Sequence, residues 1–182
     1  MAREHSLSTS SGTITIAQAQ LSDIDIVISI LEEAGQWLLE RGIYQWLPGS
    51  FSRDRIASSF ELGQVYLAKQ GEEAIGTLTL QWSDKLMWGD VPDDAGYVHR
   101  LAIRRAFAGT GLGRLLLQWA EDTAASAGKH YLRLDCWTDN PALCQYYERA
   151  GYICRGEIAF QGKQQVWKAS LYEKNVQETI DE

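Results

Sequence analysis

The chain has few cysteines, no long apolar run and fewer basic than acidic residues, and each shortage excludes a class of protein. Its three cysteines, Cys136, Cys144 and Cys154, are odd in number and lack any CxxC spacing. They indicate free buried thiols in a reducing compartment rather than a disulfide framework or a metal site. No apolar run approaches the roughly 18 residues of a membrane span, and the polar residues 1–12 lack the apolar stretch of a signal peptide. These absences predict a cytoplasmic protein with no metal and no membrane partner.

Acidic side chains outnumber basic ones, 24 to 17, which gives a formal net charge of −7. Broad nucleic-acid binding needs a basic face that displaces counterions from the phosphates, so the balance argues against that function. It is compatible with cationic substrates such as amines, although it is equally typical of an ordinary soluble protein. The length of 182 residues suits a single domain with a substantial core.

Hydrophobic periodicity divides the chain into helical and extended segments. Helices are predicted at 24–41, 53–62, 111–127 and 141–150. Strands are predicted at 13–16, 64–69, 74–82, 97–103, 131–137, 153–160 and 163–173. Short links join 64–69 to 74–82 and 153–160 to 163–173 as hairpins, whereas a helix separates 97–103 from 131–137 and predicts parallel pairing. The fold class is therefore α/β (α+β), one mixed sheet of about seven strands flanked by four helices.

The most informative feature is a glycine-rich run between an extended segment and a helical one. It reads Ala108-Gly109-Thr110-Gly111-Leu112-Gly113-Arg114. Glycines at such a junction let the main chain approach a ligand closely, and the start of a helix supplies unpaired N–H groups and partial positive charge. The run therefore predicts a site for a phosphate-bearing ligand.

Two common phosphate-binding motifs fit this run poorly. A Walker loop needs GxxxxGK followed by Ser or Thr, and the chain contains no such sequence. A dinucleotide fingerprint, GxGxxG, matches at Gly109 and Gly111, with Asp135 about 20 residues further on at the end of a predicted strand. However, Arg114 occupies the third glycine position, and the run lies too late in the chain for a doubly wound domain. A dinucleotide-dependent oxidoreductase is the weaker alternative.

A second motif follows after one predicted strand, and its sequence is Asn140-Pro141-Ala142-Leu143-Cys144-Gln145-Tyr146-Tyr147-Glu148-Arg149-Ala150-Gly151-Tyr152. In this order the two motifs resemble those of the GNAT superfamily of N-acetyltransferases, which use acetyl-coenzyme A (acetyl-CoA). The first resembles the family's Gln/Arg-x-x-Gly-x-Gly/Ala signature, from which Ala108 departs, while Arg105 replaces a common proline. The second resembles Asn-x-x-Ala-x-x-Leu-Tyr-Glu-Lys-x-Gly-Phe, with departures at Leu143 and Tyr146.

The resemblance extends over residues 13–173 and implies the fold and the donor site. The sheet would be mostly antiparallel, with its fourth and fifth strands parallel and splayed, in one acyl-CoA N-acyltransferase domain between a disordered tail at 1–12 and a polar tail at 174–182. The glycine-rich run would bind the diphosphate, and the main chain around Ile103 would pair with the pantetheine arm and stabilise the oxyanion. The donor-binding residues implied are Leu101, Ala102, Ile103, Ala108, Gly109, Thr110, Gly111, Leu112, Gly113, Arg114 and Asn140.

Tyr147 matches the family's general acid, which gives a proton to the departing thiolate. A phenol is protonated at neutral pH and can serve this purpose, typically with a contribution of about 10²–10⁴-fold. A packing aromatic on a helix face is the structural alternative. Asn140 would contact the pantetheine arm or a bound water, or would only cap the helix that follows it.

The general base stays open among five residues. An attacking amine must be neutral, so a side chain or a water must accept its proton. Histidine is the residue type that changes charge near neutral pH, and His99 lies just before the pantetheine-binding segment. Geometry has to decide before acidity does. The candidates are His99, Asp90, Asp93, Asp94 and Asp135.

The resemblance implies acetyl transfer to a primary amine of a small molecule, by direct attack in a ternary complex. A peptide N-terminus or a lysine is the alternative acceptor, and a catalytically silent acyl-CoA-binding module is the alternative function. Four tryptophans beside the loop aspartates could hold a cationic acceptor or could simply pack in the core. A homodimer is left open. The tryptophans are Trp37, Trp46, Trp82 and Trp88.

Overall fold

The computed structural model describes residues 5–9, 12–62, 64–161 and 166–177. These residues contain eight strands, five α-helices and two short 3-10 helices, and the chain divides into two compact units. The first unit comprises residues 1–80 and 100–116, and the second comprises residues 81–99 and 117–182. None of the helices in the described ranges is long and apolar enough to cross a bilayer.

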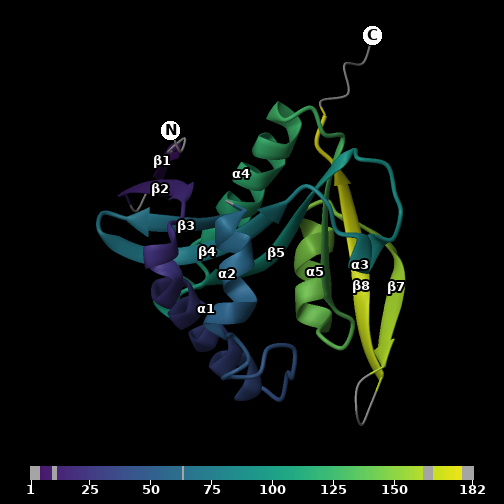
Figure 1. Cartoon of the computed structure of the whole chain (residues 1–182), viewed down its shortest axis with the longest axis horizontal. Helices are drawn as coiled ribbons and strands as arrows, with labels where there is room; N and C mark the ends of the chain where they lie inside the picture. The colour runs from purple at the N-terminus through teal and green to yellow at the C-terminus, as the bar shows by residue number, and fades with distance from the viewer. Residues whose placement is uncertain (1–4, 10–11, 63, 162–165, 178–182) are drawn as a thin grey trace. The chain divides into compact units, whose positions relative to one another are not determined.

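In the first unit, four strands lie in chain order, each antiparallel to the next. Two helices lie side by side over these strands (Figure 1). The last residues of a fifth strand lie beside the fourth, because the Arg104 N–H donates to the Ile75 carbonyl at 2.9 Å. The elements are β1 (His5–Thr9), β2 (Gly12–Gln18), α1 (Ile24–Leu39), α2 (Arg53–Glu61), β3 (Val65–Gln70), β4 (Glu73–Gln81) and the end of β5 (Ala95–Ile103).

The helices of the first unit form because their apolar residues recur on one face. In α1 the buried positions fall three and four residues apart, as the helical period requires. α2 begins where the Ser52 hydroxyl accepts a hydrogen bond from the Arg55 N–H at 3.3 Å. Both helices bury this face against the strands, in a cluster formed by Ala19, Ile24, Val27, Ile30, Leu31, Ile56, Phe60, Val65, Leu67 and Ala102.

In the second unit, the strand order is β5–β6–β8–β7. The ladder between β5 and β6 is parallel and joins Ala95–Val98 to Tyr131–Leu134, whereas the other two ladders are antiparallel. Figure 1 shows α5 beside β8. The elements are α3 (Lys85–Trp88), α4 (Leu112–Ser126, which begins in the first unit), β6 (Tyr131–Trp137), α5 (Pro141–Arg149), β7 (Ile153–Gln161) and β8 (Val166–Asn175).

The predicted fold class is confirmed: helices accompany a mixed, mostly antiparallel arrangement of strands with one parallel pair. Three details differ from the prediction. Residues 5–9, which fall in the predicted disordered tail, form β1, and one turn of helix, α3, lies in the predicted loop at 83–95. Residues 174 and 175, expected in the polar tail, complete β8, and the predicted turn at 161–162 lies partly outside the described residues.

Candidate active site

The glycine-rich run forms an exposed turn that leads into α4. Gly109 and Gly111 adopt φ of +77° and +83°, in the left-handed region that favours glycine. A Cβ added at either position would meet nothing within 4 Å, so the conformation and not the space requires glycine. The Thr110 hydroxyl donates to the Phe107 carbonyl at 2.7 Å, and the Leu115 N–H donates to the Gly111 carbonyl at 3.0 Å as the helix begins.

This turn has the donors that an anion requires. The N–H groups of Leu112 and Gly113 belong to the first turn of α4, where no acceptor exists within the helix, and the helix dipole adds partial positive charge. Ala108 differs from the prediction in one respect, because its N–H already donates to the Arg105 carbonyl at 3.2 Å. The exposed main chain from Gly109 onward therefore fits a phosphate group better than Ala108 itself does.

Glu33 on α1 fixes the chain just before the glycine-rich run. Its carboxylate accepts hydrogen bonds from the Arg105 N–H at 2.6 Å and from Arg104 Nη1 at 2.8 Å. Arg104 Nη2 also donates to the Ser29 hydroxyl at 2.7 Å. Burial alone would raise the pKa of Glu33, but the hydrogen bonds and positive charges of Arg104 and Arg105 outweigh it, so that this pKa lies below its usual value of 4.5.

The substitution Glu33→Gln is expected to lower stability at pH 7 and to reduce the loss of stability in acid. The folded-state pKa is depressed, so the contribution of this carboxylate is complete above its ordinary value of 4.5 and is lost as the pH falls through the lower folded-state pKa. Urea unfolding at neutral pH and near pH 3 measures the difference. Glu40→Gln, an exposed change at the C-cap of α1, is the control. A Glu33→Gln protein with the wild-type acid sensitivity would contradict the assignment.

Tyr147 lies in a buried aromatic group on α5. Its side chain is 7% exposed, and its ring centroid lies 5.5 Å from that of Tyr146 and 6.0 Å from those of Tyr152 and Tyr172. Burial raises the pKa of the Tyr147 hydroxyl well above its usual value of 10.0, and Cys136, among other neighbours, raises it further. Tyr147 is therefore a phenol that holds its proton at neutral pH.

Asn140 caps the helix that carries Tyr147. Its side-chain oxygen accepts a hydrogen bond from the Leu143 N–H at 3.3 Å, and Pro141 occupies the first helical turn, where a missing N–H costs nothing. Asn140 is buried. The structure thus shows the capping role, and a contact to the pantetheine arm stays a prediction.

The three cysteines are free, and they differ in exposure. Cys136 is buried and its sulfur lies 3.6 Å from that of Cys144. Burial and the neighbouring Cys144 raise the pKa of Cys136, which keeps it as an unreactive thiol. Cys154 is exposed, so the prediction of a buried thiol is wrong at that position.

Three of the five candidate bases are held by cations of the protein itself. Asp90 lies 2.8 Å from Lys85 Nζ, Asp93 pairs with Lys129, and Asp94 lies 3.1 Å from Arg133 Nη1. Each of these three carboxylates thus already faces a cation of the protein itself. The other two candidates, His99 and Asp135, lie beside each other instead.

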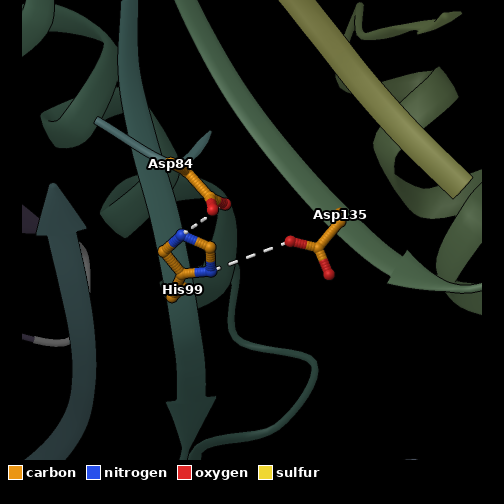
Figure 2. A group of neighbouring side chains, drawn as sticks. All are labelled: Asp84, His99 and Asp135. Atoms are coloured by element: carbon orange, nitrogen blue, oxygen red, sulfur yellow. Dashed lines mark ion pairs between the residues drawn. The ribbon is translucent and has the colours of Figure 1, made fainter. Parts of the chain in front are cut away.

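The structure brings His99 and Asp135 together with a third residue, Asp84. As Figure 2 shows, the imidazole lies between the two carboxylates: Nε2 is 3.1 Å from Asp84 Oδ2, and Nδ1 is 3.7 Å from Asp135 Oδ1. The side chain of Asp84 is 8% exposed, and those of His99 and Asp135 are 23% and 24% exposed. Burial raises the pKa of Asp135, the charge of His99 opposes that effect and the charge of Asp84 adds to it.

Asp84 was not among the predicted bases, and its position explains why. Its Oδ1 accepts a hydrogen bond from the Met87 N–H at 3.2 Å and so caps α3, while its Oδ2 faces His99. The only sequence signal is an acidic residue ahead of the short segment Lys85–Trp88, which is too weak to distinguish a helix cap from a loop.

The four tryptophans have partners within the protein. The guanidinium groups of Arg41 and Arg105 lie 4.1 and 3.9 Å from the Trp37 ring, and that of Arg133 lies 5.1 Å from the Trp88 ring. Trp82 faces Lys129 at 5.9 Å, and Trp46 packs edge-on against Phe51 at 5.7 Å. Cations of the chain itself thus lie against three of these rings, and the predicted role in holding a cationic acceptor gains no support from them.

Comparison with known proteins agrees with this architecture. The model of the acetyltransferase (GNAT) family matches residues 31–152, which is more than half of the chain. The uncharacterized N-acetyltransferase YesJ of Bacillus subtilis (strain 168) is 38% identical over 150 residues, which cover 78% of this chain and 82% of YesJ.

Solved structures show the same fold. A GNAT-family acetyltransferase from Listeria monocytogenes is 25% identical with a TM-score of 0.76, covering 94% of this chain and 99% of that one. The yncA protein of Salmonella typhimurium, solved with its cofactor acetyl-CoA, is 17% identical with a TM-score of 0.68, covering 91% of this chain and 95% of that one. The chain belongs to the GNAT family of acetyltransferases, and it is an N-acetyltransferase by this membership.

Proposed function

We propose that the protein transfers the acetyl group of acetyl-CoA to a primary amine of a small molecule, by direct attack while both substrates are bound. The observation that carries the donor assignment is the exposed turn at Gly109–Gly111, whose left-handed glycines precede the helical N-terminus of α4. Such a turn offers main-chain donors and partial positive charge to a diphosphate. The acidic net charge of −7 suits an acceptor that arrives as an ammonium ion.

The donor-binding roles follow the family motifs. In the proposal, the main chain of residues 108–114 binds the diphosphate, and that of Leu101, Ala102 and Ile103 pairs with the amides of the pantetheine arm, as a strand would. N–H groups near Ile103 stabilise the oxyanion that develops on the acetyl group. No metal ion enters these steps.

Tyr147 is the proposed general acid. The amine nitrogen forms a bond to the acetyl carbon, the carbon–sulfur bond breaks, and the phenol gives its proton to the departing sulfur. The proton carried by the newly acylated nitrogen then restores the phenol, so that Tyr147 ends each turnover as it began. Burial raises the pKa of Tyr147, so the phenol keeps its proton at neutral pH and has it available for the departing sulfur.

The function is tested by following thiol release from acetyl-CoA with a panel of acceptors. The panel contains polyamines, aromatic ethylamines and free amino acids on one side, and short peptides with free N-termini or lysines on the other. We expect turnover with small amines and at most slow turnover with peptides. Fast turnover with peptides alone would mean that the acceptor is a peptide and not a small molecule. Binding of acetyl-CoA without any turnover would mean that the protein is a catalytically silent acyl-CoA-binding module.

The substitution Gly111→Ala is expected to weaken acetyl-CoA binding by tenfold or more. A non-glycine residue held at φ of +83° costs about 1–2 kcal/mol, and the turn relaxes away from the geometry that presents its donors. Wild-type protein should gain about 2.7 kcal/mol of stability at a hundredfold excess of acetyl-CoA over Kd. The measurement is the shift in unfolding midpoint with acetyl-CoA and, for comparison, with NAD.

Gly71→Ala is the matched control for that substitution. Gly71 also has a positive φ, +59°, and a Cβ there would also meet nothing within 4 Å, but it lies in the turn between β3 and β4. Both variants should lose similar stability without ligand, and only Gly111→Ala should lose the response to acetyl-CoA. Stabilisation by NAD and not by acetyl-CoA would overturn the donor assignment.

A further inference from the structure

We propose that Asp84, His99 and Asp135 form the proton-accepting group of the acetyl transfer, with His99 as general base, Asp84 as the residue that positions it and Asp135 as the charge that stabilises the imidazolium. The proposal rests on the proposed function, since it assigns a step of that reaction. It is carried by the placement of one imidazole between two carboxylates from separate elements (Figure 2).

Asp84 is suited to hold the ring because it is itself held. Its Oδ1 caps α3 through the Met87 N–H, and its Oδ2 lies 3.1 Å from His99 Nε2 in a nearly buried environment. The two atoms are buried, and their geometry is that of an ion pair and not of a hydrogen bond. The negative charge beside Nε2 favours a proton on that nitrogen, which leaves the lone pair on Nδ1.

Nδ1 is therefore the nitrogen that accepts the proton. Its distance of 3.7 Å from Asp135 Oδ1 is too long for a hydrogen bond, so Asp135 does not occupy the lone pair. At that distance the carboxylate still stabilises a positive ring by its charge. The groups facing His99 are thus Asp84 from the start of α3 and Asp135 from β6.

The position in the fold suits a base as well. The β5–β6 ladder ends at Val98 and Leu134, and His99 and Asp135 are the next residue on each strand. Arg100, directly after His99, adopts φ of +51°, a conformation that costs a non-glycine residue energy and is typical of functional positions. Polar side chains thus gather where main-chain pairing between the two strands has stopped.

The cluster and the proposed acid belong to the same unit of the protein. Asp135 lies on β6, directly before the buried Cys136, and Tyr147 lies on α5. An acyl transfer needs this combination, because one proton has to leave the nitrogen while another reaches the sulfur.

The proton balance gives the cluster a defined task. An acceptor ammonium ion loses one proton before attack, and this proton goes to His99 Nδ1, directly or through water, and then to solvent. The bond between nitrogen and the acetyl carbon forms, the carbon–sulfur bond breaks, the sulfur takes the proton of Tyr147, and the second nitrogen proton restores Tyr147. The sum is an amide, a thiol and one released proton for each ammonium ion.

A divalent metal ion is the other ligand that a histidine and two carboxylates bind. Here each carboxylate faces a different ring nitrogen, Nε2 for Asp84 and Nδ1 for Asp135. One ligand atom of each residue nevertheless lies within 4.8 Å of the others, so a bound metal ion is the alternative that the test below has to separate from a proton.

The test compares His99→Gln and Asp84→Asn with wild type, using the best amine of the acceptor panel. We expect His99→Gln to lower kcat/KM by about 10²–10³-fold and to remove the rise of kcat/KM with pH on the acid side, with acetyl-CoA binding unchanged. Asp84→Asn, which keeps the helix cap, should lower kcat for the amine with little change in KM for acetyl-CoA, because the ring loses the carboxylate beside Nε2. A merely structural role would weaken acetyl-CoA binding and lower the unfolding midpoint as well.

A second acceptor separates the base from a general loss of structure. Hydroxylamine is largely neutral at the assay pH, so the penalty of His99→Gln should be several-fold smaller with it than with an alkylamine. Asp122→Asn, an exposed change on α4, is the control and should match wild type. A wild-type pH profile in His99→Gln would overturn the proposal, as would wild-type kcat in both cluster variants or inhibition by EDTA that Zn²⁺ reverses. Absence of turnover in the wild-type protein would instead overturn the proposed function, and this inference with it.

Discussion

Replacing Tyr147 with phenylalanine is expected to lower kcat by about 10²–10⁴-fold while acetyl-CoA binds as it does to wild type. The change removes one oxygen from a ring that packs against three other tyrosines, so the aromatic group keeps its shape. What is lost is the proton for the departing sulfur. Because burial raises the pKa of Tyr147, the wild-type enzyme should also keep its kcat at about pH 10, where a tyrosine of ordinary pKa is already half ionised.

Tyr146→Phe is the matched control for this substitution. Tyr146 is the next residue of α5, is 36% exposed and undergoes the same chemical change. Thiol release under saturating acetyl-CoA, measured for both variants and wild type, gives the comparison, and the thermal shift with acetyl-CoA confirms that binding is intact. If Tyr147→Phe turned over at the wild-type rate, the general acid would have to be another group.

Helices with a strong apolar stripe could be predicted from the sequence to within a few residues. The segment predicted at 24–41 is α1, Ile24–Leu39, and the one predicted at 111–127 is α4, Leu112–Ser126. Their periodicity reflects burial of one face, which is the same physical cause that stabilises them in the fold. The parallel pair and the two predicted hairpins followed from link length alone.

The two elements that the sequence did not predict have no such signal. β1 contains one apolar residue, Leu7, and is held by main-chain pairing with β2, which side-chain patterns do not reveal. α3 is a single turn whose residues are partly or fully exposed, and it exists because the Asp84 carboxylate caps it. In both cases the stabilising contact is made by the main chain or by one polar atom.

The general base could be predicted only in part, for the same reason. The sequence proposes five residues of equal standing, because nothing in it shows which carboxylate meets a cation. Lys129 and Arg133, which bind Asp93 and Asp94, follow them by more than thirty positions in the chain, and only the fold brings these pairs together. Strand register then places His99 and Asp135 side by side at the end of one ladder. The interaction partners of each candidate residue, and not its residue type, therefore distinguish a candidate general base from a carboxylate with a structural role.

Arg133→Met is expected to lower the free energy of unfolding by about 3–5 kcal/mol. The Arg133 side chain is 6% exposed, and it donates to Glu173 at 2.8 Å and to the Tyr97 hydroxyl at 3.0 Å, and it pairs with Asp94 at 3.1 Å. Burial alone would lower the pKa of Arg133, but the bonds with Glu173 and Tyr97 and the charge of Asp94 raise it overall. Methionine fills much of the volume of the arginine side chain. The lost stability therefore comes from the carboxylates of Glu173 and Asp94, which no longer face a cation at this position, and not from a cavity.

A double-mutant cycle shows whether that explanation is correct. Glu173, with a side chain 10% exposed, would keep only the more exposed Arg155 at 3.0 Å, so removing its charge as well should recover part of the loss. Arg133→Met combined with Glu173→Gln should therefore cost less than the sum of the single changes in urea unfolding. Lys168→Met, which breaks an exposed pair with Glu157 at 3.9 Å, is the control and should cost less than about 1 kcal/mol. An additive cycle would mean that packing of the Arg133 stem, and not its charge, stabilises the β5–β6–β8 strands.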